Sequence, residues 1–278
     1  MTDRVAGKVA LITGAARGQG RSHAIHLARE GADIIAVDAL QSFATVSYPM
    51  PTAADLAQTV KEVEALDRRV ITIQADVRDP AAMDAAVGRG LAEFGKVDVV
   101  LANAGICAMA RDQPLQAWVD VSNVNFTGVL NTLNAAIPHL QPGASMVVTG
   151  SLAALLPGGT GQEPGAAAYS WAKHSLVTLV RDLARVLAPR SIRLNGVHPT
   201  NCDTVMLQHD EMYRSFRPDL EHPTKEDTVS SFSRLQAMPV PWIDPADVSQ
   251  VMVFLASDES RYVTGQFIAA DAGGQLLI

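Results

Sequence analysis

The alternation of short apolar runs with longer amphipathic stretches constrains the fold of this chain more than any other feature. The runs are five or six residues long and rich in Val, Ile and Leu, and their apolar residues mostly follow one another without alternating with polar ones. Such runs are typical of strands buried on both faces of a parallel sheet. They predict strands at Val9–Thr13, Asp33–Val37, Val70–Gln74, Val97–Ala102, Ser145–Thr149, Ile192–Val197 and Gln266–Ala270.

Amphipathic stretches between these strands predict helices. They lie at Gly20–Glu30, Ala53–Leu66, Ala81–Phe94, Trp118–Leu140, Tyr169–Leu187 and Ala246–Leu255. Repeated strand–helix alternation implies right-handed crossovers, which place helices on both faces of the sheet. No linker rich in Pro, Gly or Ser divides the chain. We therefore expect an α/β fold, a single Rossmann-type domain over residues 1–278 with a doubly wound parallel sheet.

Three segments are longer than such a fold requires: 39–52, 152–168 and 201–244. Unusually long loops at the carboxyl ends of strands are commonly functional, so we expect two inserts and a long substrate lid. The lid contains four large apolar or aromatic side chains that either line a hydrophobic substrate pocket or pack a lid helix onto its own domain, namely Met206, Met212, Tyr213 and Phe216.

Composition excludes several classes of function. The 278 residues carry 22 basic and 29 acidic side chains, a net charge of −7, which argues against binding to nucleic acid or to an anionic membrane surface. No apolar run approaches the roughly 20 residues that span a bilayer. Cys107 and Cys202 have no metal-ligand spacing, and the histidines form no metal-binding motif, so we expect no metal. We expect a cytoplasmic protein.

A glycine-rich turn, Thr13-Gly-Ala-Ala-Arg-Gly-Gln-Gly20, joins the first strand to the first helix. Gly14, Gly18 and Gly20 allow a tight turn and a close approach of the backbone to a pyrophosphate. The helix N-terminus adds free N–H groups and a partial positive charge. Alone, the turn is also compatible with an ordinary strand-to-helix connection.

The end of the second strand points to a particular dinucleotide. Asp38 lies where a carboxylate accepts hydrogen bonds from both hydroxyls of an adenosine ribose, and an acid there repels a 2′-phosphate. Ala39 supplies no positive charge to attract one. These residues favour NAD over NADP. Arg17 could in principle meet a 2′-phosphate, but we expect it to be exposed to solvent.

Polar residues also follow the third and fourth strands. Asp76-Val77 and Asn103-Ala104-Gly105 fall at strand ends, where open α/β sheets bind ligands. Asp76 could accept a hydrogen bond from the adenine amino group, although a helix N-cap explains it equally well. The Asn103–Gly105 turn allows the chain to pass close to a cofactor.

The strongest chemical signal is Tyr169-Ser-Trp-Ala-Lys173, with Ser151 upstream at the end of the fifth strand. Residues i and i+4 share one helix face. A phenol titrates near 10, so it needs a neighbouring ammonium to act as a base at neutral pH. Ser151 would then hydrogen-bond the substrate oxygen beside Tyr169. A Tyr–Lys pair alone is ordinarily a surface feature, but with the glycine-rich turn, Asp38 and Ser151 we read it as catalytic.

Together these motifs resemble the short-chain dehydrogenase/reductase family along essentially the whole chain. The resemblance implies a catalytic tetrad of Asn125, Ser151, Tyr169 and Lys173, in which Tyr169 is the acid/base and Lys173 binds the nicotinamide ribose and relays protons through a water held by Asn125. It implies cofactor contacts from Gly14, Arg17, Gly18, Gln19, Gly20, Asp38, Asp76, Val77, Asn103, Ala104, Gly105, Tyr169, Lys173, Pro199 and Thr204. It also implies a homotetramer with the helices Trp118–Leu140 and Tyr169–Leu187 at an interface.

The inserts and the lid are similar to those of the mycofactocin-coupled, carveol dehydrogenase-like subfamily. This implies oxidation of a hydrophobic secondary alcohol, terpenoid or similar, to its ketone by a tightly held NAD that a mycofactocin-type redox carrier reoxidises. The alternatives are a conventional enzyme that exchanges NAD(H) freely, and a catalytically silent nucleotide-binding regulator. The chain departs from the family in carrying Pro199-Thr200 where Pro-Gly is usual.

Overall fold

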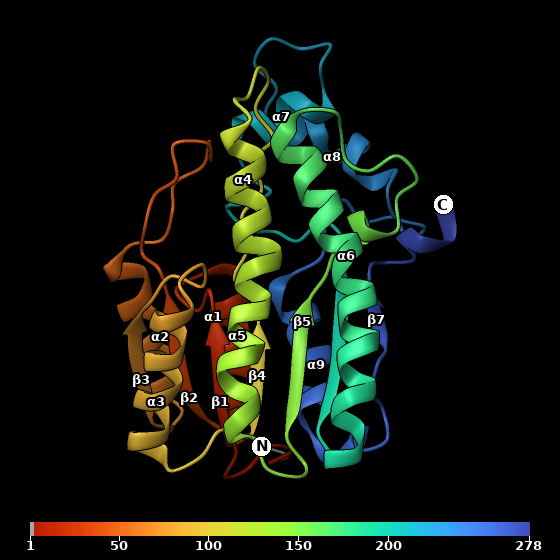
Figure 1. Ribbon diagram of the computed structural model, residues 1–278. Coiled ribbons are helices and arrows are strands. Elements are labelled where there is room, and N and C mark those ends of the chain that lie inside the picture. Colours follow the sequence, from red (N-terminus) through yellow and green to blue (C-terminus); the bar gives the residue numbers. More distant parts are fainter. Residues whose placement is uncertain (1–2) are drawn as a thin grey trace.

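Seven parallel strands form one sheet in the order β3-β2-β1-β4-β5-β6-β7. The computed structural model describes residues 3–278 (Figure 1). All seven predicted strands are confirmed, with ends shifted by up to two residues. Their bounds are β1 Val9–Thr13, β2 Asp33–Asp38, β3 Val70–Gln74, β4 Val99–Ala102, β5 Ser145–Thr149, β6 Arg193–Pro199 and β7 Phe267–Ala270.

Helices cover both faces of this sheet, as predicted (Figure 1). One face packs against α3 Pro80–Phe94, α4 Gln116–Ser122, α5 Gly128–Ala136 and α6 Pro164–Leu187. The other packs against α1 Gly18–Arg29, α2 Ala53–Glu64 and α9 Pro245–Ala256. Short 3₁₀ turns lie at Ile137–His139, Leu152–Ala154, Ala188–Arg190, Asp258–Ser260 and Gly274–Leu277. The chain is thus a single doubly wound domain with a separate hydrophobic core on each face.

Two predicted helices have different boundaries. The stretch 118–140 is three elements, because a π-helical segment, η1 Asn123–Thr127, separates α4 from α5. The helix expected from Tyr169 begins five residues earlier, at Pro164. Proline is favoured in the first turn of a helix, where its missing N–H has no partner to lose. The insert 152–168 is therefore shorter than expected and ends as helix.

The lid extends above the carboxyl ends of the strands (Figure 1). It contains α7 Asp210–Phe216 and α8 Lys225–Ser233, the latter begun by a capping box between Thr224 and Asp227. Phe232 is fully buried at the centre of a third, smaller core with Cys107, Leu207, Met212 and Tyr213. The lid therefore has its own packing, and Cys107 joins it to the main domain.

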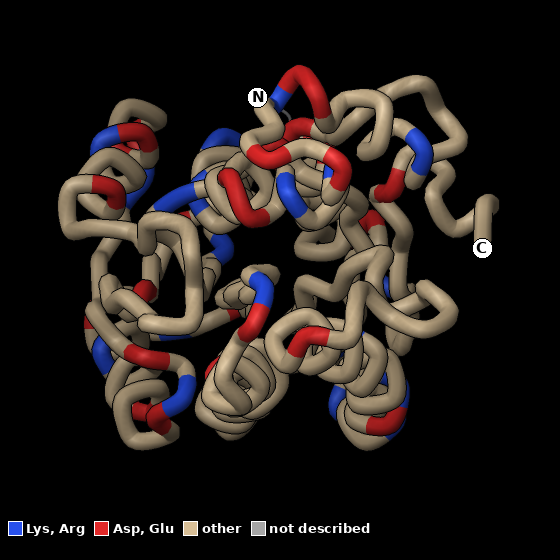
Figure 2. Tube along the Cα trace, turned by 90° about the horizontal axis from the view of Figure 1, so that it is seen from above, with Lys and Arg blue, Asp and Glu red and all other residues tan. Residues whose placement is uncertain are grey.

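Seen from above, Lys and Arg positions intersperse with Asp and Glu positions around the periphery (Figure 2). No helix within residues 3–278 combines the length and apolar character needed to cross a membrane. Strand order reverses around β1, whose neighbours are β2 and β4. This is where doubly wound sheets bind ligands.

Candidate active site

The glycine-rich turn lies between β1 and α1 and packs tightly against the loop after β4. A Cβ on Gly20 would lie 2.0 Å from the carbonyl oxygen of Gly14. Gly14 has φ +68°, and a Cβ there would lie 2.9 Å from Ala104 Cα. Only glycine fits at either position, so the backbone itself forms this wall of the cavity, with the N-terminus of α1 behind it.

Asp38 ends β2 beside this turn and is 7% exposed. Its carboxylate accepts hydrogen bonds from the main-chain N–H of Ala16 and of Leu40, each over 3.1 Å. Burial raises the pKa of Asp38, and the two N–H groups and Arg17 oppose that shift. Asp38 lines the same cavity as the glycine-rich turn, as the sequence predicts.

Arg17 corrects one expectation. It is half-buried, and its guanidinium donates to the main-chain carbonyl of Pro49 in the insert 39–52. Burial lowers the pKa of Arg17, although Tyr48, Asp55 and Asp38 raise it. The expectation of a solvent-exposed side chain was wrong, because the insert folds back over the turn.

Asp76 contradicts one of its two interpretations from the sequence. It does not cap α3, since Asp79 is the N-cap residue. Asp76 instead pairs with Arg78, with 2.6 Å between a carboxylate oxygen and a guanidinium nitrogen. Partial burial acts to raise the pKa of Asp76, but the hydrogen bonds from Arg78 lower it overall. Asp76 and Val77 nevertheless line the cavity.

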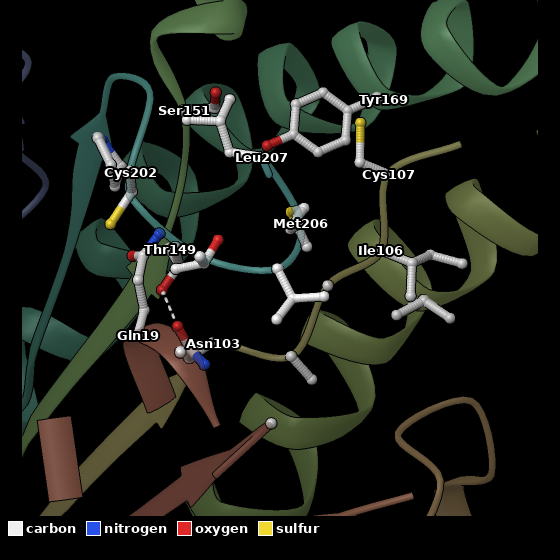
Figure 3. A pocket seen from close by; sticks show the side chains of 18 of the residues that line it. Gln19, Asn103, Ile106, Cys107, Thr149, Ser151, Tyr169, Cys202, Met206 and Leu207 are labelled. Atoms are coloured by element: carbon white, nitrogen blue, oxygen red, sulfur yellow. Dashed lines mark hydrogen bonds between the residues drawn. The ribbon is translucent and has the colours of Figure 1, made fainter. Parts of the chain in front are cut away.

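Asn103 joins three strands beneath the cavity. Its side-chain Nδ2 donates to the carbonyl of Thr13 over 3.0 Å, and its Oδ1 accepts from the hydroxyl of Thr149 over 3.1 Å (Figure 3). The main-chain N–H groups of Asn103 and Ala104 donate to the Thr13 hydroxyl, each over 3.1 Å. These bonds fix the Asn103–Gly105 turn against the glycine-rich turn.

Ser151, Tyr169 and Lys173 come together at the cavity. Ser151 follows β5, and its hydroxyl accepts from the N–H of Ala153 over 3.1 Å and lies near enough to Tyr169 to act on the pKa of the phenol. Figure 3 shows the Tyr169 hydroxyl pointing into the cavity beside Ser151. Lys173 is 4% exposed and donates from Nζ to the carbonyl of Thr149 over 2.6 Å. The long segment between Ser151 and Tyr169 does loop out to allow this contact.

The pKa values of Tyr169 and Lys173 differ in part from what the sequence predicts. Burial raises the pKa of Tyr169, Cys107 adds to the shift, and Ser151 opposes it. Burial lowers the pKa of Lys173 to about 8. The ammonium lies 5.6 Å from the centre of the Tyr169 ring. The pKa of the Tyr169 phenol is therefore raised, and not lowered as the sequence predicts, because burial affects it more than its neighbours do.

Asn125 lies in the π-helical segment and is fully buried. Its Oδ1 accepts from the N–H of Ile106 over 2.9 Å, and its Nδ2 donates to the carbonyl of Ile106 over 2.8 Å. Both polar groups of the side chain thus bind one residue of the loop after β4. The side chain fixes this loop, and π-helical segments are frequent at functional sites.

One cavity of about 540 Å³ is lined by Gly14, Asp38, Asp76, Asn103, Ser151, Tyr169 and Lys173. Asn125 does not line it, and its side chain is connected to it through Ile106. Gln19, Pro199, Thr204 and Cys107 also line the cavity. At the lid end its wall is apolar, formed by Ile106, Met206, Leu207, Met212 and Phe216 (Figure 3). Met206, Met212 and Phe216 line the cavity, and they are three of the four lid side chains that the sequence assigns either to a substrate pocket or to packing of the lid. Tyr213 instead donates to Gln208 over 3.0 Å.

Comparisons with known proteins show the family to which the chain belongs. A family model described as enoyl-(acyl carrier protein) reductase matches residues 14–275. A putative short-chain type dehydrogenase/reductase of Mycolicibacterium smegmatis is 45% identical, over 99% of this chain and 100% of that protein. The chain belongs to the short-chain dehydrogenase/reductase family. A (−)-trans-carveol dehydrogenase of Rhodococcus erythropolis is 47% identical to this family member, over 98% of this chain and 99% of that protein.

A solved short-chain dehydrogenase/reductase shares the fold almost throughout. The crystal structure of carveol dehydrogenase from Mycobacterium avium in complex with NAD has a TM-score of 0.92 and 44% identity, and the match covers 98% of this chain and 99% of that chain.

Two residues of this dehydrogenase site are not predicted by the sequence. Tyr48, in the insert 39–52, is 4% exposed, lines the cavity and accepts from the N–H of Cys107 over 3.1 Å. The available signal was an aromatic side chain within a segment that is longer than the fold requires. Thr149 acts through its main-chain carbonyl on Lys173, and no residue type identifies such a role in advance.

Proposed function

We propose that this dehydrogenase interconverts a hydrophobic secondary alcohol and its ketone with NAD as the hydride acceptor. The observation that carries the proposal is that Ser151, Tyr169 and Lys173 share one cavity with Asp38 and the glycine-rich turn. Two similar proteins support it: one is named (−)-trans-carveol dehydrogenase, and the other is a carveol dehydrogenase whose crystal structure contains NAD.

The residues present fit NAD. At Gly14, Gly18 and Gly20 the turn has no Cβ between its backbone and a pyrophosphate, and the helix N-terminus behind it attracts negative charge. Asp38 is buried at the position that meets the adenosine ribose and would repel a 2′-phosphate. Asn103, Gly105, Pro199 and Thr204 would hold the nicotinamide half.

Tyr169 carries the proton in this mechanism. Bound NAD would supply the carbon that takes the hydride from the alcohol, and its nicotinamide ring would bring a positive charge into the cavity. Ser151 already accepts from Ala153, so its hydroxyl proton is available to Tyr169 or to the substrate oxygen. We assign Ser151 to holding that oxygen beside Tyr169, which removes the alcohol proton during oxidation and returns it during reduction.

Lys173 and Asn125 complete the proposed tetrad. One donor of Lys173 is fixed on the Thr149 carbonyl, which leaves two for the nicotinamide ribose and a proton-relaying water. Because the side chain of Asn125 is committed to Ile106, we assign the holding of that water to its main chain. An intact set of these groups favours catalysis over the role of a silent regulator.

The substrate end of the cavity indicates the class of alcohol. Ile106, Met206, Leu207, Met212 and Phe216 present no charge, and Met side chains adapt to irregular apolar shapes. A compact hydrophobic alcohol such as a monocyclic terpenoid satisfies these surroundings.

Retention of NAD between turnovers is the second part of the proposal. The insert 39–52 is attached on several sides of the cofactor groove. Arg17 binds the carbonyl of Pro49, Tyr48 binds Cys107, and Thr45 donates to Asp120 on α4 over 2.7 Å. Such attachments slow the release of a cofactor that lies beneath them. A mycofactocin-type carrier would then reoxidise the bound cofactor in place.

A stoichiometry measurement tests both parts. Purified protein is mixed with excess NAD and each of a panel of hydrophobic secondary alcohols, and nucleotide absorbance is followed. Formation of one reduced nucleotide per subunit, resuming after addition of an artificial electron acceptor, supports retention. Steady accumulation beyond one equivalent contradicts retention and supports a conventional, freely exchanging dehydrogenase. Absence of reduction with every alcohol contradicts the proposed activity.

We also propose that the enzyme is a homotetramer that associates partly through α4 and α6. Trp171 on α6 is 44% exposed, beside Leu115 at 73% and Val119 at 40%. Trp171 contacts Trp118 on α4, with ring centres 6.0 Å apart. Exposed apolar side chains on two helices that pack together are typical of an interface. Sedimentation velocity of Trp171→Glu against the unchanged protein tests it, since a tetramer that uses this face should dissociate.

A further inference from the structure

His198 lies next to the end of β6, behind the catalytic cavity, and is 3% exposed. Its Nδ1 lies 3.1 Å from the main-chain nitrogen of Ser151. A main-chain N–H can only donate, so Nδ1 is the acceptor. The proton of the neutral ring is therefore on Nε2.

The imidazole is held in one orientation by its neighbours. It stacks on Phe267 of β7, with ring centres 4.2 Å apart and planes 12° from parallel. A Cβ on Gly150 would lie 2.4 Å from His198 Nδ1, and one on Gly196 would lie 2.1 Å from the Phe267 ring. The two glycines thus leave room for the stacked pair, which packs directly against the backbone that leads into Ser151.

The surroundings also keep the ring neutral. Burial lowers the pKa of His198 to about 4, Lys173 adds to this shift, and Asp271 opposes it. At neutral pH Nδ1 therefore keeps the lone pair that receives the Ser151 N–H. A protonated ring would have no acceptor to offer at this position.

We infer that His198 is a positioning residue that holds the Ser151 hydroxyl in its catalytic orientation. Ser151 has extended backbone angles, φ −172° and ψ 153°, and its hydroxyl must reach both the Ala153 N–H and Tyr169. Anchoring the Ser151 N–H fixes the backbone from which the side chain projects. Small displacements of a catalytic group have large effects on rate. This inference rests on the proposed role of Ser151.

Three substitutions of His198 distinguish the effect of its hydrogen-bond acceptor from the effect of the volume that its ring fills. His198→Asn keeps an acceptor near the position of Nδ1, His198→Leu removes it, and His198→Gln stays polar but places its acceptor farther out, near Nε2. We expect Leu and Gln to lower kcat by about 10- to 100-fold with NAD affinity within twofold, and Asn to recover most of the loss. If His198→Leu does not fold, the comparison of Gln with Asn remains decisive.

The double variant Ser151→Ala/His198→Leu, or with Gln, tests whether His198 acts through Ser151. If it does, the double variant turns over no more slowly than Ser151→Ala alone, because the group being positioned is already absent. Additive losses, or full kcat in both His198→Leu and His198→Gln, overturn the inference. Full activity of Ser151→Ala itself would instead contradict the proposed function.

Discussion

Gln236 donates a hydrogen bond from Nε2 to the hydroxyl of Thr200 over 2.8 Å. Gln236 follows the lid helix α8, and Thr200 follows β6 at the edge of the cavity. Both side chains are buried. Thr200 stands where the family usually has glycine, which could not make this bond, so the departure from the family pattern is explained by attachment of the lid.

Removing this bond should loosen the lid and leave cofactor binding intact. We expect Gln236→Leu to raise KM for the alcohol by about three- to tenfold, the effect of losing one hydrogen bond. Thr200→Gly should give a similar rise, and the double variant no further one. Steady-state kinetics measures this, with Gln58→Leu on the exposed side of α2 as the matched control. An unchanged KM in both single variants would show that the lid does not depend on this contact.

Asp38 should determine the choice of nucleotide. Asp38→Ala removes the carboxylate that meets the ribose and repels a 2′-phosphate, and it also frees the N–H groups of Ala16 and Leu40. The ratio of kcat/KM for NAD to that for NADP should fall by about 10- to 100-fold, the scale of one or two charged hydrogen bonds. Asp38→Asn, which keeps the size of the side chain, should give an intermediate ratio. A preference unchanged in both variants would refute the assignment.

Arg78 should slow cofactor release although it lies outside the cavity wall. It binds Asp76, donates to Gln41 over 3.3 Å and lies 4.6 Å from the centre of the Phe43 ring, so it braces the insert 39–52. Arg78→Ala should accelerate NAD dissociation by about three- to tenfold, measured by stopped-flow displacement. Arg89→Ala, exposed on α3, is the control. Equal rates in both variants would leave the retention proposal without this support.

Acid should destabilise the fold partly through His23. His23 is fully buried with Nδ1 2.8 Å from the Ser249 hydroxyl, and burial lowers its pKa to about 3. The unfolded chain takes up this proton near pH 6.5, so stability is fully present above that pH and is lost as the pH falls toward 3. The free energy of unfolding, measured in urea between pH 7 and 4, should depend less steeply on pH in His23→Asn, by up to about 1.4 kcal/mol per pH unit. His222→Asn, whose side chain is 78% exposed, is the control, and an equal slope in both would contradict this account.

The sequence predicted what depends on local pattern. All seven strands and the meeting of Ser151 with Tyr169 followed from apolar runs and from motifs at strand ends. The sequence does not predict the start of α6 at Pro164, because the glycines on both sides of that residue are typical of a loop. The sequence does not predict the π-helical segment around Asn125 either, because no residue type is characteristic of a change from α-helical to π-helical hydrogen bonding.

Contacts between distant segments were beyond the sequence. Arg17 was assigned to solvent, and only the fold shows that Pro49 accepts from it. The sequence does not predict that Arg78, which pairs with Asp76, also reaches Gln41 in the insert. No motif in the sequence distinguishes His198, because its contact with Ser151 depends on the pairing of β5 with β6.

The most direct test of the central claim is the turnover of Tyr169→Phe. The substitution removes only the hydroxyl that carries the proton, so kcat for alcohol oxidation should fall by about 10²- to 10⁴-fold while NAD affinity stays within twofold. Tyr262→Phe, at a residue that is 90% exposed, should turn over normally. Retention of full activity by Tyr169→Phe, with NAD bound as in the unchanged protein, would contradict the account.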